Sequence, residues 1–392
     1  MVPPGGYAGV IGLAASLLAL AIWLVLVFAR SGFWLARERD TLGQPADPIS
    51  WPTVNAVVPA RDEADVIARS IGSLIAQDYP GEFRIILIDD NSSDGTAAIA
   101  GGLPGAAERL TVIGGAPLAR GWTGKLWAVS QGIAAAGEAP AWLLLTDADI
   151  AHAPDTLRRL VARGGGDDRV LVSLMARLRC ESMAEKALIP AFVFFFQMLY
   201  PFGEVNRRGP EGGRGRGAAA GGCMLVNSRA LAAAGGIAEV RTALIDDCAF
   251  GALMKTQGPV WLGLTDRAVS IRRYDTTGSI AAMISRSAYA QLGYSPLALA
   301  GTVIGLAVMY LVPPLLAVFG SGPAQIAGIA AWALMALVFQ PILYFYRRSP
   351  LWGAALPLIA GFYAGCTLLS AWQHHRGRGG LWKGRVQAEI GA

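Results

Sequence analysis

The sequence predicts an α/β protein with a mostly parallel sheet, joined to membrane helices on both sides. Between residues 50 and 295, continuous apolar strands alternate with segments of helical period, which is typical of a parallel sheet covered on both faces. Outside this region lie apolar stretches of about twenty residues, the length that crosses a bilayer. Of the 392 residues, 54% are hydrophobic, which is too many for an ordinary soluble protein.

The first apolar stretch, residues 7–29, is long enough to cross a hydrocarbon core of roughly 30 Å as a helix. No Lys or Arg precedes it, whereas Arg30, Arg37 and Arg39 follow it. The positive-inside rule therefore predicts an external N-terminus and a cytosolic α/β region. A cleaved signal peptide would need a basic start and a shorter apolar core, so we expect a membrane anchor over residues 1–30.

The α/β region begins with a strand over residues 53–60 and a helix over residues 64–77, in which apolar residues recur at helical spacing. The later expected elements are strands at 83–90, 110–114 and 142–147, and helices at 94–101, 125–136 and 249–256. Residues 187–202 form a shorter apolar segment, predicted to be a buried or membrane-surface helix. In parallel sheets ligands bind at the carboxyl ends of the strands, so the site is expected there.

The predicted C-terminal membrane region, residues 296–373, contains three apolar stretches, at 297–319, 324–346 and 351–372. Three crossings would place the basic tail, residues 374–392, outside, whereas the positive-inside rule predicts that it stays inside. We therefore expect about three transmembrane or interfacial helices, and the sequence leaves open whether two or three of them cross.

The net charge of +5 comes with basic residues concentrated beside the apolar stretches, which favours an anionic membrane leaflet over nucleic acid as the partner. The four cysteines have no C-x-x-C spacing and are expected to be reduced, buried thiols.

Four acidic clusters occur in the α/β region: P-A-R-D-E at 59–63, D-D-N-S-S-D-G-T at 89–96, T-D-A-D at 146–149 and I-D-D at 245–247. Alternate carboxylates such as Asp147 and Asp149 at a strand end can share one divalent cation, Mg²⁺ or Mn²⁺, that bridges to substrate phosphates. An isolated D-x-D is more often a pair of solvated acids at a turn. The other three acidic clusters shift the balance toward a ligand site. Asp94 is open to two interpretations, a helix cap or a ligand.

The four motifs in this order resemble the family 2 inverting glycosyltransferases, over residues 54–294. The resemblance implies a GT-A type, Rossmann-like domain that binds a nucleotide sugar. Within that family, W-T-G-K-L-W-A at 122–128, G-G-C-M-L at 221–225 and the flanking apolar stretches look most like the hopene-associated glycosyltransferases. The segment W-K-G-R at 382–385 is similar to the tails of that group and of carotenoid-type lipid glycosyltransferases.

Carried over from the family, Glu63 and Asp90 would bind the nucleoside, and Lys125 would lie near the nucleotide. Asp147 and Asp149 would flank the diphosphate and the metal, with Asp149 as the direct ligand.

The family also implies that Asp247, with Asp246 as the alternative, is the general base. Processive and ceramide-type members carry Q-x-x-R-W after the base, whereas residues 283–291 here lack that Gln and Trp. Arg286 can still reach a diphosphate, so a single transfer is expected rather than polymer extension.

Together these observations predict a hexosyltransferase in a bacterial cytoplasmic membrane that moves one sugar from a nucleotide-diphosphate sugar, expected to be a UDP-sugar, to a hopanoid-related lipid. The alternatives are a ceramide-, carotenoid- or polyprenyl-phosphate-type lipid acceptor, or a non-catalytic membrane scaffold of the same fold. A scaffold has no chemical need for all four acidic clusters, so their presence favours the enzyme.

Overall fold

The computed structural model describes residues 4–138, 140–208, 216–377, 381–382 and 385–386. These form two compact units, residues 4–37, 180–201 and 274–377 in the first and residues 38–179 and 202–273 in the second. Of the expected α/β region, 50–295, residues 180–201 and 274–295 belong to the first unit. Much of the expected tail, 374–392, lies outside the described residues.

The second unit is built on one eight-stranded sheet with strand order β3-β2-β1-β4-β7-β6-β8-β5. Its strands are β1 Val54–Ala60, β2 Phe83–Asp89, β3 Leu110–Gly114, β4 Trp142–Thr146, β5 Ile150–His152, β6 Leu171–Arg177, β7 Cys223–Asn227 and β8 Val260–Ser270. The pairs from β3 to β4 are parallel, as is β6 with β8, whereas β7 and β5 run antiparallel to their neighbours. The mostly parallel sheet predicted from the sequence is therefore confirmed.

Every residue of β1 and of β4 is buried, as expected for strands covered on both faces. In the register of the sheet, Ala60 pairs with Asp89, and Val57 pairs with Leu145. The carboxyl ends of β1, β2 and β4 therefore reach the same edge of the sheet, and the acidic clusters that follow these strands lie along that edge.

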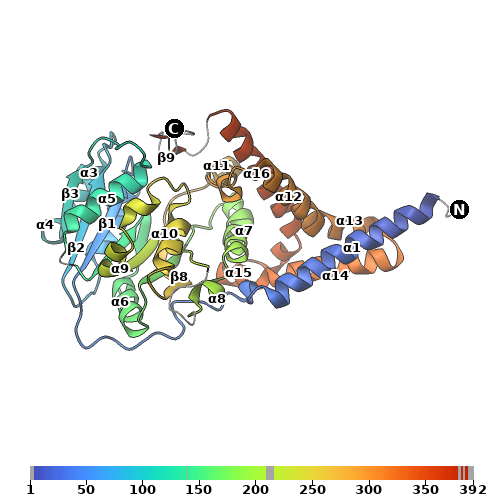
Figure 1. Cartoon of the computed structure of the whole chain (residues 1–392), viewed down its shortest axis with the longest axis horizontal. Coiled ribbons are helices and arrows are strands. Elements are labelled where there is room, and N and C mark those ends of the chain that lie inside the picture. The colour runs from blue at the N-terminus through green and yellow to red at the C-terminus, as the bar shows by residue number, and fades with distance from the viewer. Residues whose placement is uncertain (1–3, 139, 209–215, 378–380, 383–384, 387–392) are drawn as a thin grey trace. The chain divides into compact units, whose positions relative to one another are not determined.

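The helices of the second unit cover this sheet (Figure 1). They are α2 Ile67–Ile75, α3 Thr96–Gly101, α4 Ala106–Arg109, α5 Gly124–Ala136, α6 Thr156–Gly166, α8 Phe202–Asn206, α9 Ser228–Ala233, the 3-10 turn η2 Ile237–Val240, and α10 Asp246–Lys255. Helix α5 packs on β1 and β2 so closely that a Cβ added at Gly132 would lie 2.3 Å from Val57 Cγ1. The absence of a side chain there lets the helix approach the sheet.

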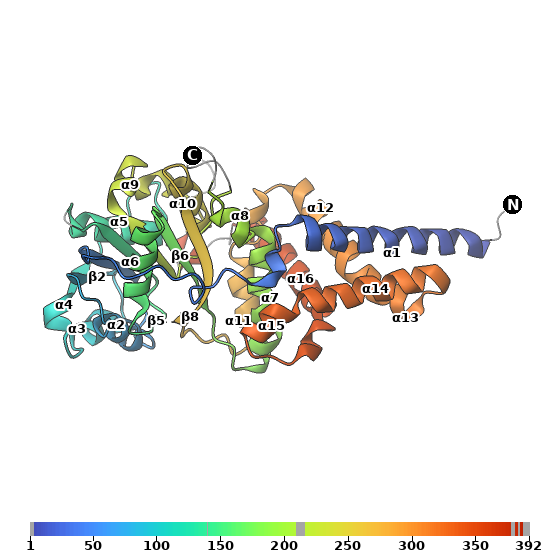
Figure 2. The same cartoon turned by 90° about the horizontal axis from the view of Figure 1, so that it is seen from below.

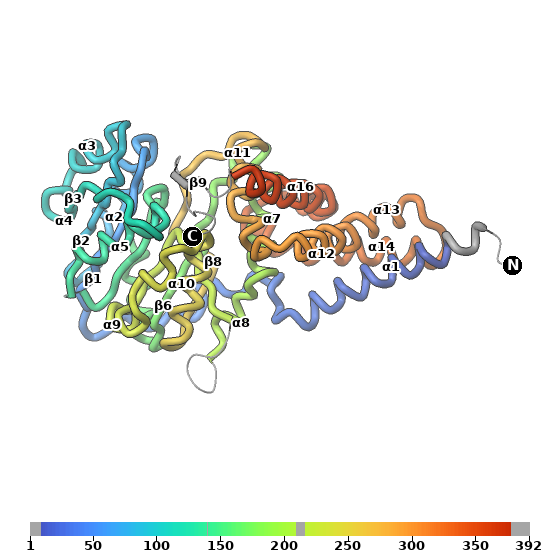
Figure 3. The backbone as a smooth tube through the Cα atoms, turned by 45° about the horizontal axis from the view of Figure 1, so that its top comes forward, coloured from blue at the N-terminus to red at the C-terminus, as the bar shows by residue number. Residues whose placement is uncertain are grey.

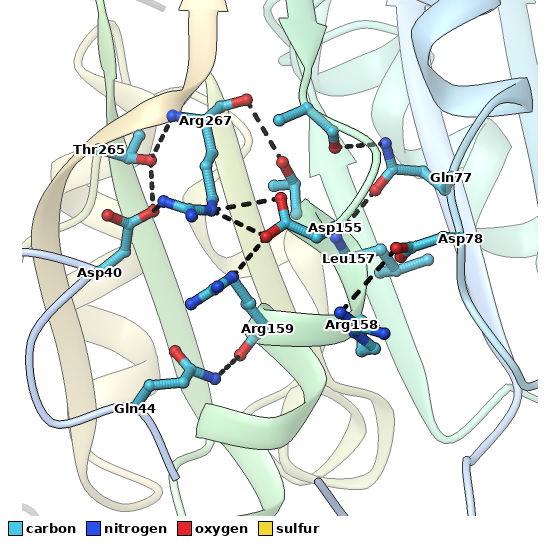
Figure 4. A network of polar contacts seen from close by, with 12 residues as sticks. Asp40, Gln44, Gln77, Asp78, Asp155, Leu157, Arg158, Arg159, Thr265 and Arg267 are labelled. Atoms are coloured by element: carbon cyan, nitrogen blue, oxygen red, sulfur yellow. Dashed lines mark hydrogen bonds and ion pairs between the residues drawn. The ribbon is translucent and has the colours of Figure 1, made fainter. Parts of the chain in front are cut away.

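The segment that connects the first apolar helix to the sheet, residues 38–44, is itself part of the second unit (Figure 4). The backbone N–H of Asp40 donates to Leu264 O at 3.0 Å, and Asp40 Oδ2 accepts from Thr265 Oγ1 at 2.5 Å. Next to this pair, Arg267 Nε donates to both carboxylate oxygens of Asp155, at 3.2 and 3.1 Å. The connecting segment is therefore attached to β8 by backbone and side-chain contacts.

The first unit is helical. It contains α1 Pro4–Ala29, η1 Phe33–Leu35, α7 Met183–Leu199, α11 Thr277–Ser285, η3 Ala290–Leu292, α12 Pro296–Leu306, the π-helical turn η4 Ala307–Leu311, α13 Val312–Phe319, α14 Gly322–Val338, α15 Gln340–Phe345, η5 Pro350–Gly353 and α16 Leu356–His375. Helix α1 runs beside α14 (Figure 2), and α11 lies beside α16 (Figure 3).

Three helical segments of the described residues are long and apolar enough to cross a membrane: Gly9–Ala29, Pro296–Phe319 and Gly322–Phe345. The prediction of apolar, membrane-length helices before and after the sheet-containing region in the sequence is confirmed. Among the described residues, helix α16 does not meet this criterion of length and composition.

The apolar segment 187–202 largely corresponds to α7, which is an interior helix of the first unit. Phe194 is fully buried, and its ring lies 5.4 Å from that of Phe33 and 5.2 Å from that of Phe339, centroid to centroid. Arg30 donates to the carbonyl of Met198 at the last turn of α7, where a positive charge stabilises the helix end.

Candidate active site

The loops that follow β1 and β2 are tied to each other by hydrogen bonds. Asp62 Oδ1 accepts from Ser93 N at 2.8 Å, and Asp94 Oδ2 accepts from Ala64 N at 2.9 Å. Asp94 also accepts from both the backbone N–H and the hydroxyl of Thr96, at 3.0 and 2.6 Å. Asp94 therefore holds the two loops together, and the residue at the N-cap of α3 is Gly95.

Asp90 lies at this junction with 1% of its surface exposed. Its backbone N–H donates to Ala60 O at 2.8 Å, so the end of β2 is fixed against the end of β1. Arg61 Nη1 lies 3.5 Å from Asp90 Oδ2 and donates to Asp90 O at 2.5 Å. The arginine of the first motif thus pairs with the aspartate of the second, a contact that the sequence analysis did not predict.

Arg272, just beyond the end of β8, joins two of the predicted site residues. Its Nε donates to Asp149 Oδ2 at 2.7 Å, and its Nη2 donates to both carboxylate oxygens of Glu63, each at 2.7 Å. Burial opposes the charge on Arg272, but Asp149 and Glu63 hold the pKa of the guanidinium above its usual range. The sequence analysis missed Arg272, and the only signal was an I-R-R-Y run directly after a strand.

Lys125, in the first turn of α5, joins the third acidic cluster to the fourth. Its Nζ lies 2.9 Å from Asp147 Oδ1 and 3.1 Å from Asp246 Oδ2. Burial alone would lower the pKa of Lys125, but the two carboxylates raise it above its usual range. Burial raises the pKa of Asp147. The sequence analysis expected Lys125 near the nucleotide, and that role stays a prediction; its contacts with Asp147 and Asp246 were not foreseen.

Asp247 occupies the first turn of α10, beside Asp246. Its Oδ2 accepts from Gly221 N at 2.9 Å, and its Oδ1 accepts from the backbone N–H of Cys248 at 2.8 Å. Burial first, and then the charge of Asp246, raise the pKa of Asp247 to about 6, although Lys125 opposes this. A carboxylate with such a pKa is suited to accept a proton near neutral pH.

A hollow of about 330 Å³ lies beside these residues. One part of its wall is polar, formed by Lys125, Thr146, Asp147, Gly221 and Asp246, and the rest is apolar, formed by Pro59, Leu126, Val129, Leu145, Met224, Ile237 and Phe250.

Asp147 and Asp149 are the two carboxylates that would hold a cation, and this role stays a prediction. Within the described part of the chain, no group of three or more His, Cys, Asp or Glu side chains could hold a metal ion by itself. Two carboxylates nevertheless fit a hard cation such as Mg²⁺ or Mn²⁺, which commonly takes its remaining ligands from substrate phosphates and water.

Arg286, the remaining predicted donor-binding residue, is exposed at the end of α11 and belongs to the first unit. The other predicted site residues all belong to the second unit. The role of Arg286 therefore stays a prediction.

Comparison with known proteins finds similarity over part of the sheet-containing region. Residues 56–225 match the profile of Glycosyl transferase family 2, and this range contains the first three acidic clusters and Lys125. A segment that covers 36% of the chain is similar to the succinoglycan biosynthesis protein ExoO of Rhizobium meliloti (strain 1021), with 35% identity over 147 residues. The chain spans 40% of the length of that relative.

Among solved structures, the chain is similar to the mannosyltransferase PcManGT from Pyrobaculum calidifontis, determined in complex with GDP-Man and Mn²⁺. The match has a TM-score of 0.56 and 18% identity, and it covers 92% of this chain and 99% of the other. The predicted GT-A fold is thereby confirmed.

Proposed function

We propose that this chain, which contains a glycosyltransferase family 2 domain, is a membrane-bound inverting glycosyltransferase that moves one sugar from a nucleotide-diphosphate sugar to a lipid. The proposal rests mainly on four carboxylates that lie at one edge of the sheet, those of Glu63, Asp90, Asp147 and Asp149. Lys125 pairs with Asp147 and with Asp246 at the start of α10. A scaffold protein would not need this arrangement.

On the donor side, Glu63 and Asp90 would bind the nucleoside, and Asp147 and Asp149 would hold a divalent cation when the nucleotide sugar is bound. The cation supplies positive charge that offsets the charge developing on the leaving diphosphate. The complex of the Pyrobaculum mannosyltransferase with GDP-Man and Mn²⁺ supports this class of donor and cation, with a UDP-sugar as our expected donor.

On the acceptor side, Asp247 is the general base. It takes the proton of the acceptor hydroxyl as that oxygen bonds to the anomeric carbon, while the bond from that carbon to the diphosphate oxygen breaks on the opposite face. The products are a glycoside of inverted configuration, a nucleoside diphosphate and a protonated Asp247. The backbone N–H groups of Gly221 and Cys248 fix the orientation of the carboxylate.

The proposed acceptor is a hopanoid-related lipid. Three membrane-length apolar helices in the same chain support a lipid acceptor, because such an acceptor stays in the bilayer. The hopanoid assignment rests on the sequence resemblance, and ceramide-, carotenoid- and polyprenyl-phosphate-type lipids are the competing acceptors. Lipid profiling of a deletion strain separates them, since only the true product disappears.

The roles of the acids are tested with three variants of the full-length chain in membranes. Asp247→Asn should retain binding of the nucleotide sugar but lose transfer by about a hundredfold or more, since general-base catalysis typically contributes 10²–10⁴. Asp149→Asn should lose both transfer and cation-dependent donor binding. Asp246→Asn is the matched control for the base. If Asp246→Asn abolishes transfer and Asp247→Asn stays active, the two assignments exchange; full activity of all three variants would contradict the proposed function.

A further inference from the structure

Arg272 lies between the carboxylate assigned to the nucleoside and the carboxylate assigned to the cation. All three of its hydrogen bonds, to Asp149 Oδ2 and to both oxygens of Glu63, measure 2.7 Å. The exposed fractions of the three side chains are 26% for Arg272, 6% for Glu63 and 13% for Asp149. Charges that are this far removed from water interact more strongly than charges on an open surface.

The backbone fixes Arg272 in this place. Strand β8 pairs with β5 up to Ser270 and Ile150, and the N–H of Ile271 donates to the carbonyl of Asp149 at 2.9 Å. The residue that follows Ile271 is therefore held next to Asp149. The contact between the guanidinium and the carboxylate follows from the strand pairing.

This arrangement sets the charge that a metal ion meets. Within this group of three side chains, Glu63 and Asp149 each carry one negative charge and Arg272 carries one positive charge. The guanidinium is bound to Asp149 through Oδ2, while Oδ1 makes no hydrogen bond with any other described residue. A free divalent cation at Oδ1 therefore meets a positive group on the same carboxylate, whereas a nucleoside diphosphate brings negative charge that offsets it.

We propose that Arg272 keeps the affinity of Asp149 for a free cation low, so that the cation binds together with the nucleoside diphosphate. This inference rests on the proposed function, which assigns Asp149 to the cation. Its consequence is that the empty enzyme stays free of metal and selects the metal–nucleotide complex.

The test measures Mn²⁺ binding to the purified full-length protein by electron paramagnetic resonance of free Mn²⁺, without nucleotide and with UDP or GDP. The unaltered protein should bind Mn²⁺ weakly alone and more tightly with one of the nucleotides. Arg272→Gln and Arg272→Met remove the positive charge and should bind free Mn²⁺ about tenfold more tightly, with a smaller gain on adding nucleotide.

Three controls isolate the charge. Arg272→Lys keeps the charge without the planar fork and should bind free Mn²⁺ like the unaltered protein. Arg158→Met, on α6, removes an arginine that forms an ion pair with Asp78 and should change nothing. Asp149→Asn should abolish binding, which assigns the signal to this site. Circular dichroism melts check that each variant is folded, and the Gln variant keeps a side-chain donor in place of the guanidinium.

The inference is overturned if free Mn²⁺ binds no more tightly to the Gln or Met variant, or if the Lys variant gains as much affinity as they do. If the unaltered protein still binds Mn²⁺ more tightly with a nucleotide in those cases, the proposed function stands. If the unaltered protein binds Mn²⁺ neither alone nor with either nucleotide, then the cation assignment in the proposed function fails together with this inference.

Discussion

Asp247 shows how its surroundings change the chemistry of one residue. A carboxylate in water has a pKa near 4. Burial and the neighbouring charge of Asp246 raise the pKa of Asp247 to about 6, while the hydrogen bonds from Gly221 and Cys248 limit the shift. The side chain is thus more basic than an exposed aspartate and still ionised at neutral pH.

This shift predicts the pH dependence of the reaction. The rate of transfer at saturating donor should rise as the pH increases through about 6 and then level off, because only ionised Asp247 can accept the proton. The measurement is a pH–rate profile with purified protein. A profile that is flat from pH 5 to pH 8 would show that a different group is the base.

The same shift has a consequence for stability. Because folding raises the pKa of Asp247, the favourable contribution of this group is complete below the unfolded pKa, near 4, and is lost as the pH rises through about 6. As the pH rises from 4 to 7.5, the free energy of unfolding of Asp247→Asn should therefore increase relative to that of the unaltered protein. Thermal unfolding at the two pH values measures this difference.

At the scale of single elements, the packing of α5 on the sheet positions Lys125. Gly132 lies on the face of α5 that contacts β1, where an added Cβ would come 2.3 Å from Val57 Cγ1 and 3.3 Å from Ile88 Cγ1. Such a clash forces either the helix or the strand to move. A shift of α5 would also change the distance from Lys125 to Asp147 and Asp246.

Gly132→Ala should therefore destabilise the domain by about 1–3 kcal/mol, the usual cost of overpacking a core, and should lower transfer. Gly72→Ala is the matched control, because Gly72 also lies within a helix but an added Cβ there would have no atom within 4 Å. It should leave stability unchanged or raise it by up to about 1 kcal/mol. Equal melting temperatures for the two variants would contradict the close packing of α5.

The connecting segment at residues 38–44 supports a second prediction at this scale. Asp40 is 5% exposed and accepts a hydrogen bond from Thr265, and burial raises its pKa. Asp40→Ala leaves the Thr265 hydroxyl without this acceptor and should cost about 1–3 kcal/mol. Asp40→Asn keeps an acceptor oxygen of the same shape and should cost less. Thermal melts decide the order, and an Asn variant less stable than the Ala variant would contradict the argument.

For the whole molecule, the described apolar helices predict how the chain crosses the membrane. With crossings at Gly9–Ala29, Pro296–Phe319 and Gly322–Phe345, the sheet-containing unit and the end of α16 should lie on the same side. Arg347 and Arg348 directly follow the third crossing, and the positive-inside rule places them in the cytosol.

Cysteine labelling with a membrane-impermeant reagent tests this topology. Arg84→Cys in the domain and Arg376→Cys after α16 should be protected in intact cells and labelled in inverted vesicles. Ser321→Cys, in the exposed turn between α13 and α14, should show the opposite pattern. Labelling of Arg376→Cys in intact cells while Arg84→Cys stays protected would show that α16 also crosses.

The sequence alone determined the first half of the sheet and the order of the acidic clusters. Continuous apolar runs such as β1, all of it buried, identify covered parallel strands, and an acid just after such a run must lie at the carboxyl edge. The apolar helices that precede and follow the sheet-containing region in the sequence were predicted equally well, because their length and composition suffice. The strands β5 to β8 were not predicted: β5 has three residues, and Asp266 and Arg267 interrupt the apolar pattern of β8, whereas β6 and β7 are short apolar runs that were not recognised as strands.

Only the tertiary structure decided which distant residues complete the site. Arg272 lies 209 residues from Glu63 in the sequence, and Lys125 lies between acids that come from β4 and α10. Periodicity reports which face of an element is buried, but it carries no information about which other element covers that face. The pairing of β8 with β5 brings Arg272 to Asp149, and the packing of α5 on β1 places Lys125 beside Asp147.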